Sequence, residues 1–510
     1  MPEESLTRQV TRGLRWSLLN NILGKLGTFA AGLILARILD PRDFGVFAAA
    51  LAVMQIFLGL NDVGLSAAVV RWPGDVRRIT GTAATLVLAT SALTYLAYCA
   101  FVPLFAHALQ IPEARTLLYV LGLALVVDGL FAVHSAVITR ELLQRQRTVV
   151  DMSNLVLTTV VTLGCAWAGL GPWSLVWGRL AGNVVAGMVI VKLTPVKIRP
   201  TLDRPTARAL LVFGVPLAGS GLLTLAMLNV DYLVVGRLLG PVALGYYLMA
   251  FNLASWPINM FAFAVARVSL AGFAELADDR ARLARAYVSS LRLLAAVVLP
   301  ACVLLATLAE PTVRVLYGDR WTPAAAALAP LALMGAVRVL AEFSYDLFIA
   351  GGRPRAVLAV QAAWTLSLVP ALWVLTSRGG IRGTAWAHLV VALVVTAPLT
   401  LVLLRRHDIA TVALVRALRR PVLACLPLAI MAASVSRLVH TDLAGLVLGA
   451  LAGSAVYAAL TAPVWREARQ LVAGDNGRPT RPLTARRARW SARRAPGAAG
   501  RRSSQDRAAG

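Results

Sequence analysis

The chain has 510 residues, 58% of them hydrophobic, and its 50 Lys and Arg residues outnumber its 24 Asp and Glu residues to give a formal net charge of +26. Soluble domains are usually about 45–50% apolar, and apolar runs of about 20 residues recur along this chain, which excludes a soluble domain with one anchor. Because the runs are continuously apolar rather than alternating, they indicate membrane-spanning helices and not a barrel.

The apolar runs predict an all-α polytopic membrane protein with about fourteen transmembrane helices. In chain order the predicted spans are residues 16–36, 44–70, 80–106, 116–138, 152–169, 173–192, 209–235, 243–266, 288–309, 324–350, 356–376, 383–404, 421–438 and 443–464. Residues 1–15 form a polar segment before the first span. Residues 466–510 are rich in Arg, Ala, Pro, Gly and Ser without an apolar run, which predicts a disordered basic tail.

An internal repeat relates two of the connections between predicted spans. Residues 36–50 read ARILDPRDFGVFAAA, and residues 236–250 read GRLLGPVALGYYLMA in the same register. The matched positions include Arg37 with Arg237, Pro41 with Pro241 and Gly45 with Gly245. Such a repeat predicts two equivalent six-helix bundles, over residues 16–200 and 201–410, around a central cavity. Residues 411–465 then supply two extra helices outside the repeat.

The distribution of Lys and Arg predicts the orientation in the membrane. With the N-terminus in the cytoplasm, the outer side holds nine of them: Arg37, Arg42, Arg115, Arg237, Arg314, Arg320, Arg378, Arg382 and Arg437. Because cytoplasmic loops carry the basic excess, both termini are predicted to be cytoplasmic. The same asymmetry accounts for most of the net charge without a nucleic acid partner. The basic tail is predicted either to lie on anionic lipid or to be solvated without a specific role.

Five blocks of sequence carry a resemblance to a known family. They are ARILDPRDFGVFA at 36–48, DVGLSAAVVR at 62–71, GLGPWSLV at 169–176, DYLVVGRLLGPVALGYY at 231–247 and YGDRW at 317–321. With these blocks the chain, over roughly residues 10–465, resembles the bacterial polysaccharide flippases of the Wzx type. These belong to the multidrug/oligosaccharidyl-lipid/polysaccharide exporter superfamily.

The resemblance implies a function in the plasma membrane. It implies a transporter that flips undecaprenyl-diphosphate-linked oligosaccharide to the outer leaflet by alternating access, with polysaccharide polymerase and glycosyltransferases as further partners. Three alternatives stay open: a cation-coupled multidrug exporter, a peptidoglycan-precursor flippase of the same superfamily, and a non-transporting scaffold of a glycan-assembly complex. Interior basic residues favour an anionic substrate over the cationic drugs of an exporter.

Three basic residues fall inside predicted spans, where an ionisable side chain costs about 2.5–3.5 kcal/mol to insert. These are Lys25, Arg179 and Arg338. We predict that they face the cavity and bind the diphosphate or an acidic sugar; the alternative is that each pairs with a carboxylate or snorkels to an interface. Asn21 and Asn229 are predicted to hydrogen-bond sugar hydroxyls, or else to join helices.

Acidic residues inside the second bundle are candidates for coupling. Arg338, Glu342 and Asp346 are spaced by four residues and therefore share one helix face. They form either an ion-pair ladder or a group in which Glu342 or Asp346 exchanges a proton during the cycle. Asp231 lies shortly before the second copy of the repeat and is a further coupling candidate.

The corner arginines and the absence of catalytic motifs complete the sequence-based expectations. Arg37 and Arg237 are predicted to mark the membrane boundary, or to form an outer gate by pairing across the bundles. We find no combination of nucleophile, base and orienting group, no Walker A sequence and no metal-binding spacing of the five histidines. The sequence therefore predicts a protein that is not an enzyme and that needs no cofactor or metal.

Overall fold

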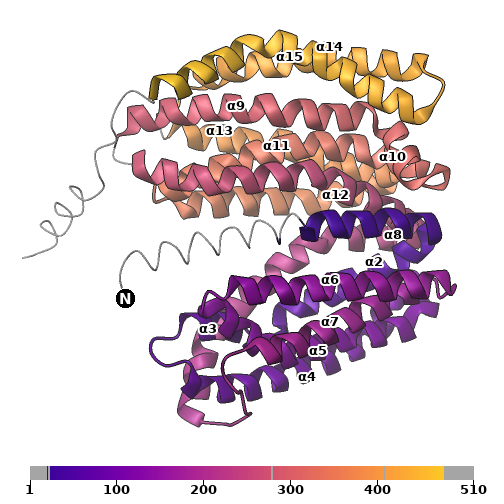
Figure 1. The fold of residues 1–510 in the computed structure, drawn as a ribbon, viewed down its shortest axis with the longest axis vertical. Coiled ribbons are helices and arrows are strands. Elements are labelled where there is room, and N and C mark those ends of the chain that lie inside the picture. Colours follow the sequence, from indigo (N-terminus) through magenta and orange to yellow (C-terminus); the bar gives the residue numbers. More distant parts are fainter. Residues whose placement is uncertain (1–19, 21–22, 277–278, 407, 476–510) are drawn as a thin grey trace, which may run out of the picture. The chain divides into compact units, whose positions relative to one another are not determined.

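The described part of the chain is α-helical and contains no β-strand. The structure, a computed structural model, describes every residue except 1–19, 21–22, 277–278, 407 and 476–510. Figure 1 shows helices that run roughly parallel, with α4 to α7 in one group, α9, α11 and α12 in another, and α2 and α8 between them. The expected all-α polytopic membrane fold is confirmed.

The first bundle begins with a helix at residues 23–38. Its other elements are α2 (Pro41–Asn61), α3 (Leu65–Arg71), α4 (Arg77–Ala108), the 3₁₀-helix η1 (Pro112–Ala114), α5 (Arg115–Arg140), α6 (Gln144–Trp167) and α7 (Trp173–Leu193). Helix α2 starts where the sequence favours a helix start. Pro41 takes the first position, and the carboxylate of Asp43 accepts the backbone N–H of Asp40 at 3.1 Å.

The second bundle begins with α8 (Arg204–Leu276) and α9 (Arg280–Thr307). It continues with α10 (Ala309–Tyr317), the 3₁₀-helix η2 (Asp319–Ala324), α11 (Ala325–Ala350), α12 (Pro354–Val391), the π-helix η3 (Ala392–Thr396) and α13 (Ala397–Arg405). Two helices follow, α14 (Thr411–Leu438) and α15 (Asp442–Asp475).

Two of these helices contain a break, each at a glycine with positive φ. Helix α8 breaks at Gly240 (φ 79°, ψ −179°) and α12 at Gly380 (φ 58°, ψ −147°), conformations that side chains with a Cβ rarely adopt. Each break falls between two of the spans predicted from the sequence. Among the described residues, eleven helical segments are long and apolar enough to cross a membrane, and the number fourteen stays a prediction.

The two copies of the sequence repeat lie against each other. Helix α2 packs on α8, and a Cβ on Gly45 would lie 1.7 Å from the carbonyl oxygen of Pro241. Reciprocally, a Cβ on Gly245 would lie 1.9 Å from the carbonyl oxygen of Pro41. The glycines therefore permit two backbones to meet around a local two-fold relation between the bundles. The largest buried cluster of apolar side chains extends across this contact and includes Met54, Tyr247 and Trp321.

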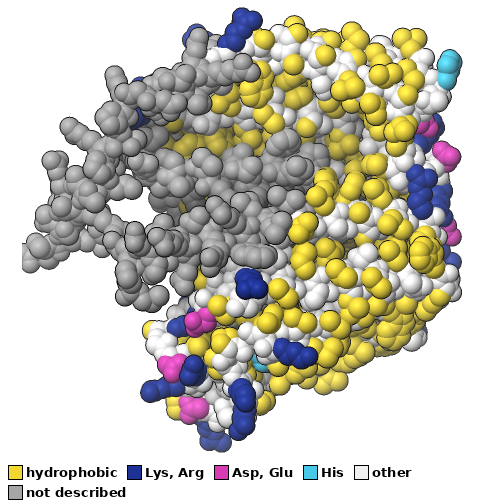
Figure 2. Space-filling model, viewed as in Figure 1, with side chains coloured by type: hydrophobic (Ala, Val, Ile, Leu, Met, Phe, Trp, Pro, Cys, Tyr) yellow, Lys and Arg dark blue, Asp and Glu magenta, His cyan; other side chains and the backbone are white. Residues whose placement is uncertain are grey.

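The chain divides into two compact units, Met1–Ala459 and Leu460–Gly510, and the cavities described below lie in the first. Helix α15 continues to Asp475, past the point where the sequence predicts the basic tail to begin. The rest of that tail, residues 476–510, lies outside the described residues. The division of the first unit into bundles at residues 200 and 410 remains a prediction. Figure 2 shows a broad hydrophobic surface over the helices, with charged side chains gathered mainly toward its margins.

Candidate functional site

A large cavity lies between the two bundles and has a volume of about 890 Å³. Its walls come from helix 23–38, α2, α6 and α7 of the first bundle and from α8 of the second. Lys25, Arg179 and Asn229, three of the residues singled out from the sequence, line this cavity. Further polar side chains in its wall belong to Asn20, Gln55, Asn154, Asn183 and Asn252. We call it the main cavity.

Close packing of α6 on α7 builds one wall of the main cavity. Gly178 and Gly182 lie one helical turn apart, and a Cβ on either would lie within 2 Å of the hydroxyl oxygen of Thr162 or Thr158. Small residues at this spacing let two membrane helices approach closely. The approach brings polar side chains of the two helices within hydrogen-bonding distance in the membrane interior.

A chain of amide groups extends from this wall toward α5. Asn154 donates to the side-chain oxygen of Asn183 at 3.1 Å, and Asn183 donates to the carboxylate of Asp128 at 2.9 Å. Arg179, on the next turn of α7, attracts the Asp128 carboxylate electrostatically. The Nε of Arg179 is buried without a hydrogen-bond partner among the described residues. Arg179 thus keeps a donor in the wall of the cavity while Asp128 balances its charge.

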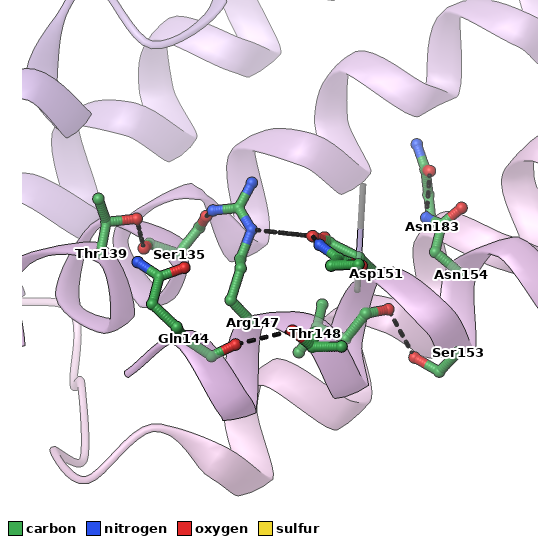
Figure 3. Close-up of polar contacts among 11 residues, drawn as sticks. Ser135, Thr139, Gln144, Arg147, Thr148, Asp151, Ser153, Asn154 and Asn183 are labelled. Atoms are coloured by element: carbon green, nitrogen blue, oxygen red, sulfur yellow. Dashed lines mark hydrogen bonds and ion pairs between the residues drawn. The ribbon is translucent and has the colours of Figure 1, made fainter. Parts of the chain in front are cut away.

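A second polar cavity of about 520 Å³ adjoins the main cavity inside the first bundle. The two share wall residues on α6 and α7, including Asp151, Asn154 and Asn183. Figure 3 shows Arg147 between Ser135 and Asp151. Its Nη1 lies 3.2 Å from the Ser135 hydroxyl, and its Nε lies 3.4 Å from the Asp151 carboxylate. Asn20 donates to the same carboxylate at 2.8 Å. Polar side chains therefore continue from the main cavity into the first bundle.

The second bundle holds a separate, smaller cavity of about 230 Å³, which we call the α8–α11–α12 cavity. Arg338, expected beside Lys25 and Arg179, lies here instead, and its Nε donates to the Glu342 carboxylate at 2.8 Å. This bond is the i,i+4 ion pair that the spacing suggested. Asp346 lies one turn further along α11.

Asp231 lines the same small cavity and is 3% exposed. Its carboxylate accepts the hydroxyl of Tyr247 at 2.8 Å and lies 3.6 Å from Nε2 of His388. The Tyr247 hydroxyl is also 3.2 Å from His388 Nε2. Because a buried carboxylate is costly unless it is hydrogen-bonded, these contacts explain how Asp231 is tolerated inside the bundle.

Each corner arginine forms a hydrogen bond with the opposite bundle that joins a side chain to a backbone carbonyl oxygen. Arg37 donates from Nη2 to the carbonyl oxygen of Val315 at 2.7 Å. The carbonyl oxygen of Arg237 accepts from the side chain of Gln110 at 3.0 Å. Each corner therefore meets a segment of the other bundle, although the two arginines do not bond to each other in this part of the structure. Asn21, the remaining candidate, lies outside the described residues.

Several residues of these sites were not identified from the sequence. His388 was grouped with the other scattered histidines, and Asn183 was not noticed. The GxxxG spacing of Gly178 and Gly182 is the one local signal that marks the α7 wall. The contacts of His388 join residues far apart in the chain, which no local pattern reveals.

A cavity with polar side chains between two equivalent helical bundles is the arrangement found in many membrane transporters. The chain belongs to the family described as polysaccharide biosynthesis protein, which it matches over residues 34–326. The resemblance to polysaccharide flippases is thereby confirmed.

Two characterised relatives support this assignment. The chain is 28% identical over 330 residues to the succinoglycan biosynthesis transport protein ExoT of Rhizobium meliloti (strain 1021), covering 64% of this chain and 66% of the relative. It is 21% identical over 398 residues to the lipopolysaccharide biosynthesis protein WzxC of Escherichia coli (strain K12), covering 77% of this chain and 80% of the relative. The first alignment thus spans just under two thirds of the relative.

The fold is similar to that of the lipid II flippase MurJ in an inward closed conformation. The TM-score is 0.71 at 14% identity, over 88% of this chain and 99% of MurJ. A multidrug resistance MATE family transporter in an inward-facing conformation gives a TM-score of 0.57 at 17% identity, over 74% of this chain and 94% of the transporter. At these identities the similarity concerns the fold.

Proposed function

We propose that the chain is a flippase that moves undecaprenyl-diphosphate-linked oligosaccharide across the plasma membrane for export of a cell-surface polysaccharide. The observation that carries the proposal is the main cavity between the bundles, with Lys25, Arg179 and Asn229 in its wall. Basic side chains bind phosphate oxygens through charge-assisted hydrogen bonds, and a guanidinium offers two parallel donors. The surrounding asparagines and Gln55 offer donors and acceptors for sugar hydroxyls.

An apolar cavity beside the main cavity suits the lipid part of this substrate. It has a volume of about 390 Å³ and is lined by residues of helix 23–38, α8, α9, α10 and α15. Phe29 and Trp256, whose ring centroids are 4.3 Å apart, lie in its wall. The neighbouring residues Thr28 and Asn252 line the main cavity. A polar head in the main cavity and an isoprenoid chain along this apolar surface would each meet matching chemistry.

The contacts at the corners support an alternating-access cycle. On the predicted topology, with both termini cytoplasmic, the Gly45–Gly245 contact and the corner hydrogen bonds lie at the outer side. The structure then corresponds to a state closed toward the outside, and opening requires these contacts to separate. Arg37 and Gln110 belong to this outer gate. An inside-negative potential favours outward movement of an anionic head by about 2.3 kcal/mol per charge per 100 mV.

Deletion of the gene followed by lipid analysis tests the proposal. We expect loss of surface polysaccharide and accumulation of lipid-linked repeat units in the inner leaflet. Complementation with Lys25→Gln or Arg179→Gln should neither restore the surface polysaccharide nor clear the accumulated repeat units. Arg78→Gln, a change at an exposed residue outside the cavities, should do both. Unchanged glycan together with altered drug tolerance would contradict the proposal.

The same variants separate transport from a scaffold role. A scaffold that only assembles the polysaccharide polymerase and glycosyltransferases has no use for cations in a buried cavity. Normally expressed Lys25→Gln and Arg179→Gln proteins that support full polysaccharide export would therefore favour the scaffold. Accumulation of peptidoglycan precursor in the deletion strain would instead favour a peptidoglycan-precursor flippase.

A further inference from the structure

The cluster of Asp231, Tyr247 and His388 holds three titratable side chains in the interior of the second bundle. Asp231 and His388 are 3% and 4% exposed, and Tyr247 is fully buried. The proposed binding of the substrate head in the main cavity uses none of them, since Asp231 and His388 line the separate α8–α11–α12 cavity.

The hydrogen-bond inventory of the cluster leaves one imidazole nitrogen without a partner among the described residues. The Tyr247 hydroxyl has a single proton, and it donates this proton to Asp231 at 2.8 Å. The 3.2 Å contact between Tyr247 and His388 then requires Nε2 of His388 to be the donor. In neutral imidazole the other nitrogen carries a lone pair. That nitrogen, Nδ1, is buried without a hydrogen-bond partner among the described residues.

The cluster also joins three helical segments that the transport cycle must move. Asp231 precedes the break of α8 at Gly240, Tyr247 follows it, and His388 lies on α12. Tyr247 is two residues beyond Gly245, where α8 meets the backbone of α2. Tyr247 therefore lies beside the contact between the bundles.

We propose that Asp231, Tyr247 and His388 form a proton-binding site that couples proton entry to opening of the contact between α2 and α8; this coupling role rests on the proposed function. A proton that enters the α8–α11–α12 cavity binds Nδ1 of His388. The cluster then holds an imidazolium beside the Asp231 carboxylate, and its net charge changes from −1 to 0. Imidazole is the side chain suited to such exchange near neutral pH. Release of the proton restores the first state.

Among the described residues, the other ionisable groups considered around the cluster lie on α8, α11 and α2. Tyr232 on α8 is next to Asp231, and Arg338, Glu342 and Tyr345 on α11 line the same small cavity. On α2, which packs on α8, the ionisable residues Arg42 and Asp43 are confined to the first turn. The Arg338–Glu342 pair, which lines the same cavity, is partly exposed, with side chains 47% and 37% accessible.

Proton binding can be measured without any transport. The ring centroids of Trp364 and His388 are 6.1 Å apart, so a charged imidazole is close enough to alter the emission of the indole. We define the Trp364 signal as the difference in tryptophan fluorescence emission between wild type and Trp364→Phe. Both proteins are measured in lipid nanodiscs from about pH 5 to pH 8. We expect a pH-dependent Trp364 signal that His388→Gln abolishes. His134→Gln is the matched control, because Nδ1 of His134 on α5 is also buried without a described partner, and the signal should persist.

The coupling role is measured in proteoliposomes with a fluorescent undecaprenyl-diphosphate-linked disaccharide. A proton gradient, acidic on the side that corresponds to the cell exterior, should accelerate flipping several-fold. Asp231→Asn and His388→Gln should lose this acceleration, and His134→Gln should keep it. A Trp364 signal that is flat with pH, or unchanged in His388→Gln, overturns the proton site. Flipping that ignores the gradient overturns the coupling, whereas failure of wild type to flip any lipid overturns the proposed function and leaves the Trp364 result standing.

Discussion

The indole N–H of Trp321 donates to the carbonyl oxygen of Ala36 at 2.8 Å and joins the second bundle to the end of the opening helix of the first. The neighbouring Arg320 pairs with Asp40 at 2.9 Å and also donates to the carbonyl oxygen of Arg37. The opposite corner is held in the same way, because Gln110 of the first bundle donates to the carbonyl oxygen of Arg237 in the second. Each bundle thus forms hydrogen bonds to the inter-helix connection that carries the repeat in the other bundle.

Replacing Trp321 with Phe should weaken this closure. The ring is retained, but the buried carbonyl oxygen of Ala36 loses its indole donor, which costs about 1–3 kcal/mol. In proteins without the four native cysteines, a cysteine at Leu51 in the main cavity should react faster with an impermeant reagent added from outside. Trp373→Phe, at a 53% exposed position, is the control and should react like the parent. Equal labelling rates in both variants would contradict the closure role of Trp321.

Adding a methyl group at Gly45 or Gly245 should separate α2 from α8. Each new Cβ would meet a backbone carbonyl oxygen at less than 2 Å, and a backbone cannot move aside as a flexible side chain can. We expect Gly45→Ala to lower the melting temperature by several degrees and to increase outside labelling at position 51. Gly164→Ala, where the Cβ meets no atom within 4 Å, should be neutral or stabilising. A neutral Gly45→Ala would show that the contact is loose in the membrane.

Most predicted spans coincide with helices because long apolar runs record helices directly, whereas the predicted span 44–70 is divided between α2 and α3. The repeat of residues 36–50 at residues 236–250 also indicated equivalent bundles. It did not indicate that Gly45 and Gly245 pack on each other, because a repeat shows equivalence of position and carries no distance. The hydrogen bond from Trp321 to Ala36 was not predicted for the same reason, since the two residues are 285 positions apart in the chain.

Only some of the predicted cavity residues share one cavity in the structure. Which of them do so depends on the direction in which each helix face points. The cost of burying a charge identified Lys25 and Arg179, which do share the main cavity with Asn229. The same argument placed Arg338 with them, but the face of α11 that carries Arg338 points to Asp231 and His388 in the smaller cavity. Burial cost identifies unusual residues, whereas the rotation of each helix decides which of them meet.

The start of α8 predicts a dependence of stability on pH. Asp203 accepts hydrogen bonds from the side chain and the backbone N–H of Thr206, and these bonds lower the pKa of the carboxyl below its ordinary value. A carboxyl with a lowered pKa stabilises the folded state above the unfolded pKa of about 3.9, and the contribution is lost as the pH falls through the folded pKa. Thr206→Val should therefore lower the melting temperature at pH 7, and the difference from wild type should shrink toward pH 3. Thr365→Val, at a half-buried position where the hydroxyl donates to the carbonyl oxygen of Gln361, should show no such pH dependence.

Arg179 provides the sharpest test of the main cavity because its charge has two separable effects. Its attraction to Asp128 stabilises the fold, and its side chain lines the main cavity, where the guanidinium can donate to the substrate. Arg179→Gln should therefore lower both the melting temperature and the flipping rate. Loss of a charge-assisted hydrogen bond of about 1.5–3 kcal/mol corresponds to roughly tenfold or more in rate.

The double variant Arg179→Gln/Asp128→Asn separates these two effects. Removal of both charges leaves no unpaired carboxylate, so the melting temperature should recover toward that of wild type. The flipping rate should stay as low as in Arg179→Gln, because the substrate donor is still missing, and Arg179→Lys should recover part of it as a single point charge. If flipping recovers together with stability, Arg179 acts only as the partner of Asp128, and the phosphate-binding role passes to Lys25 alone.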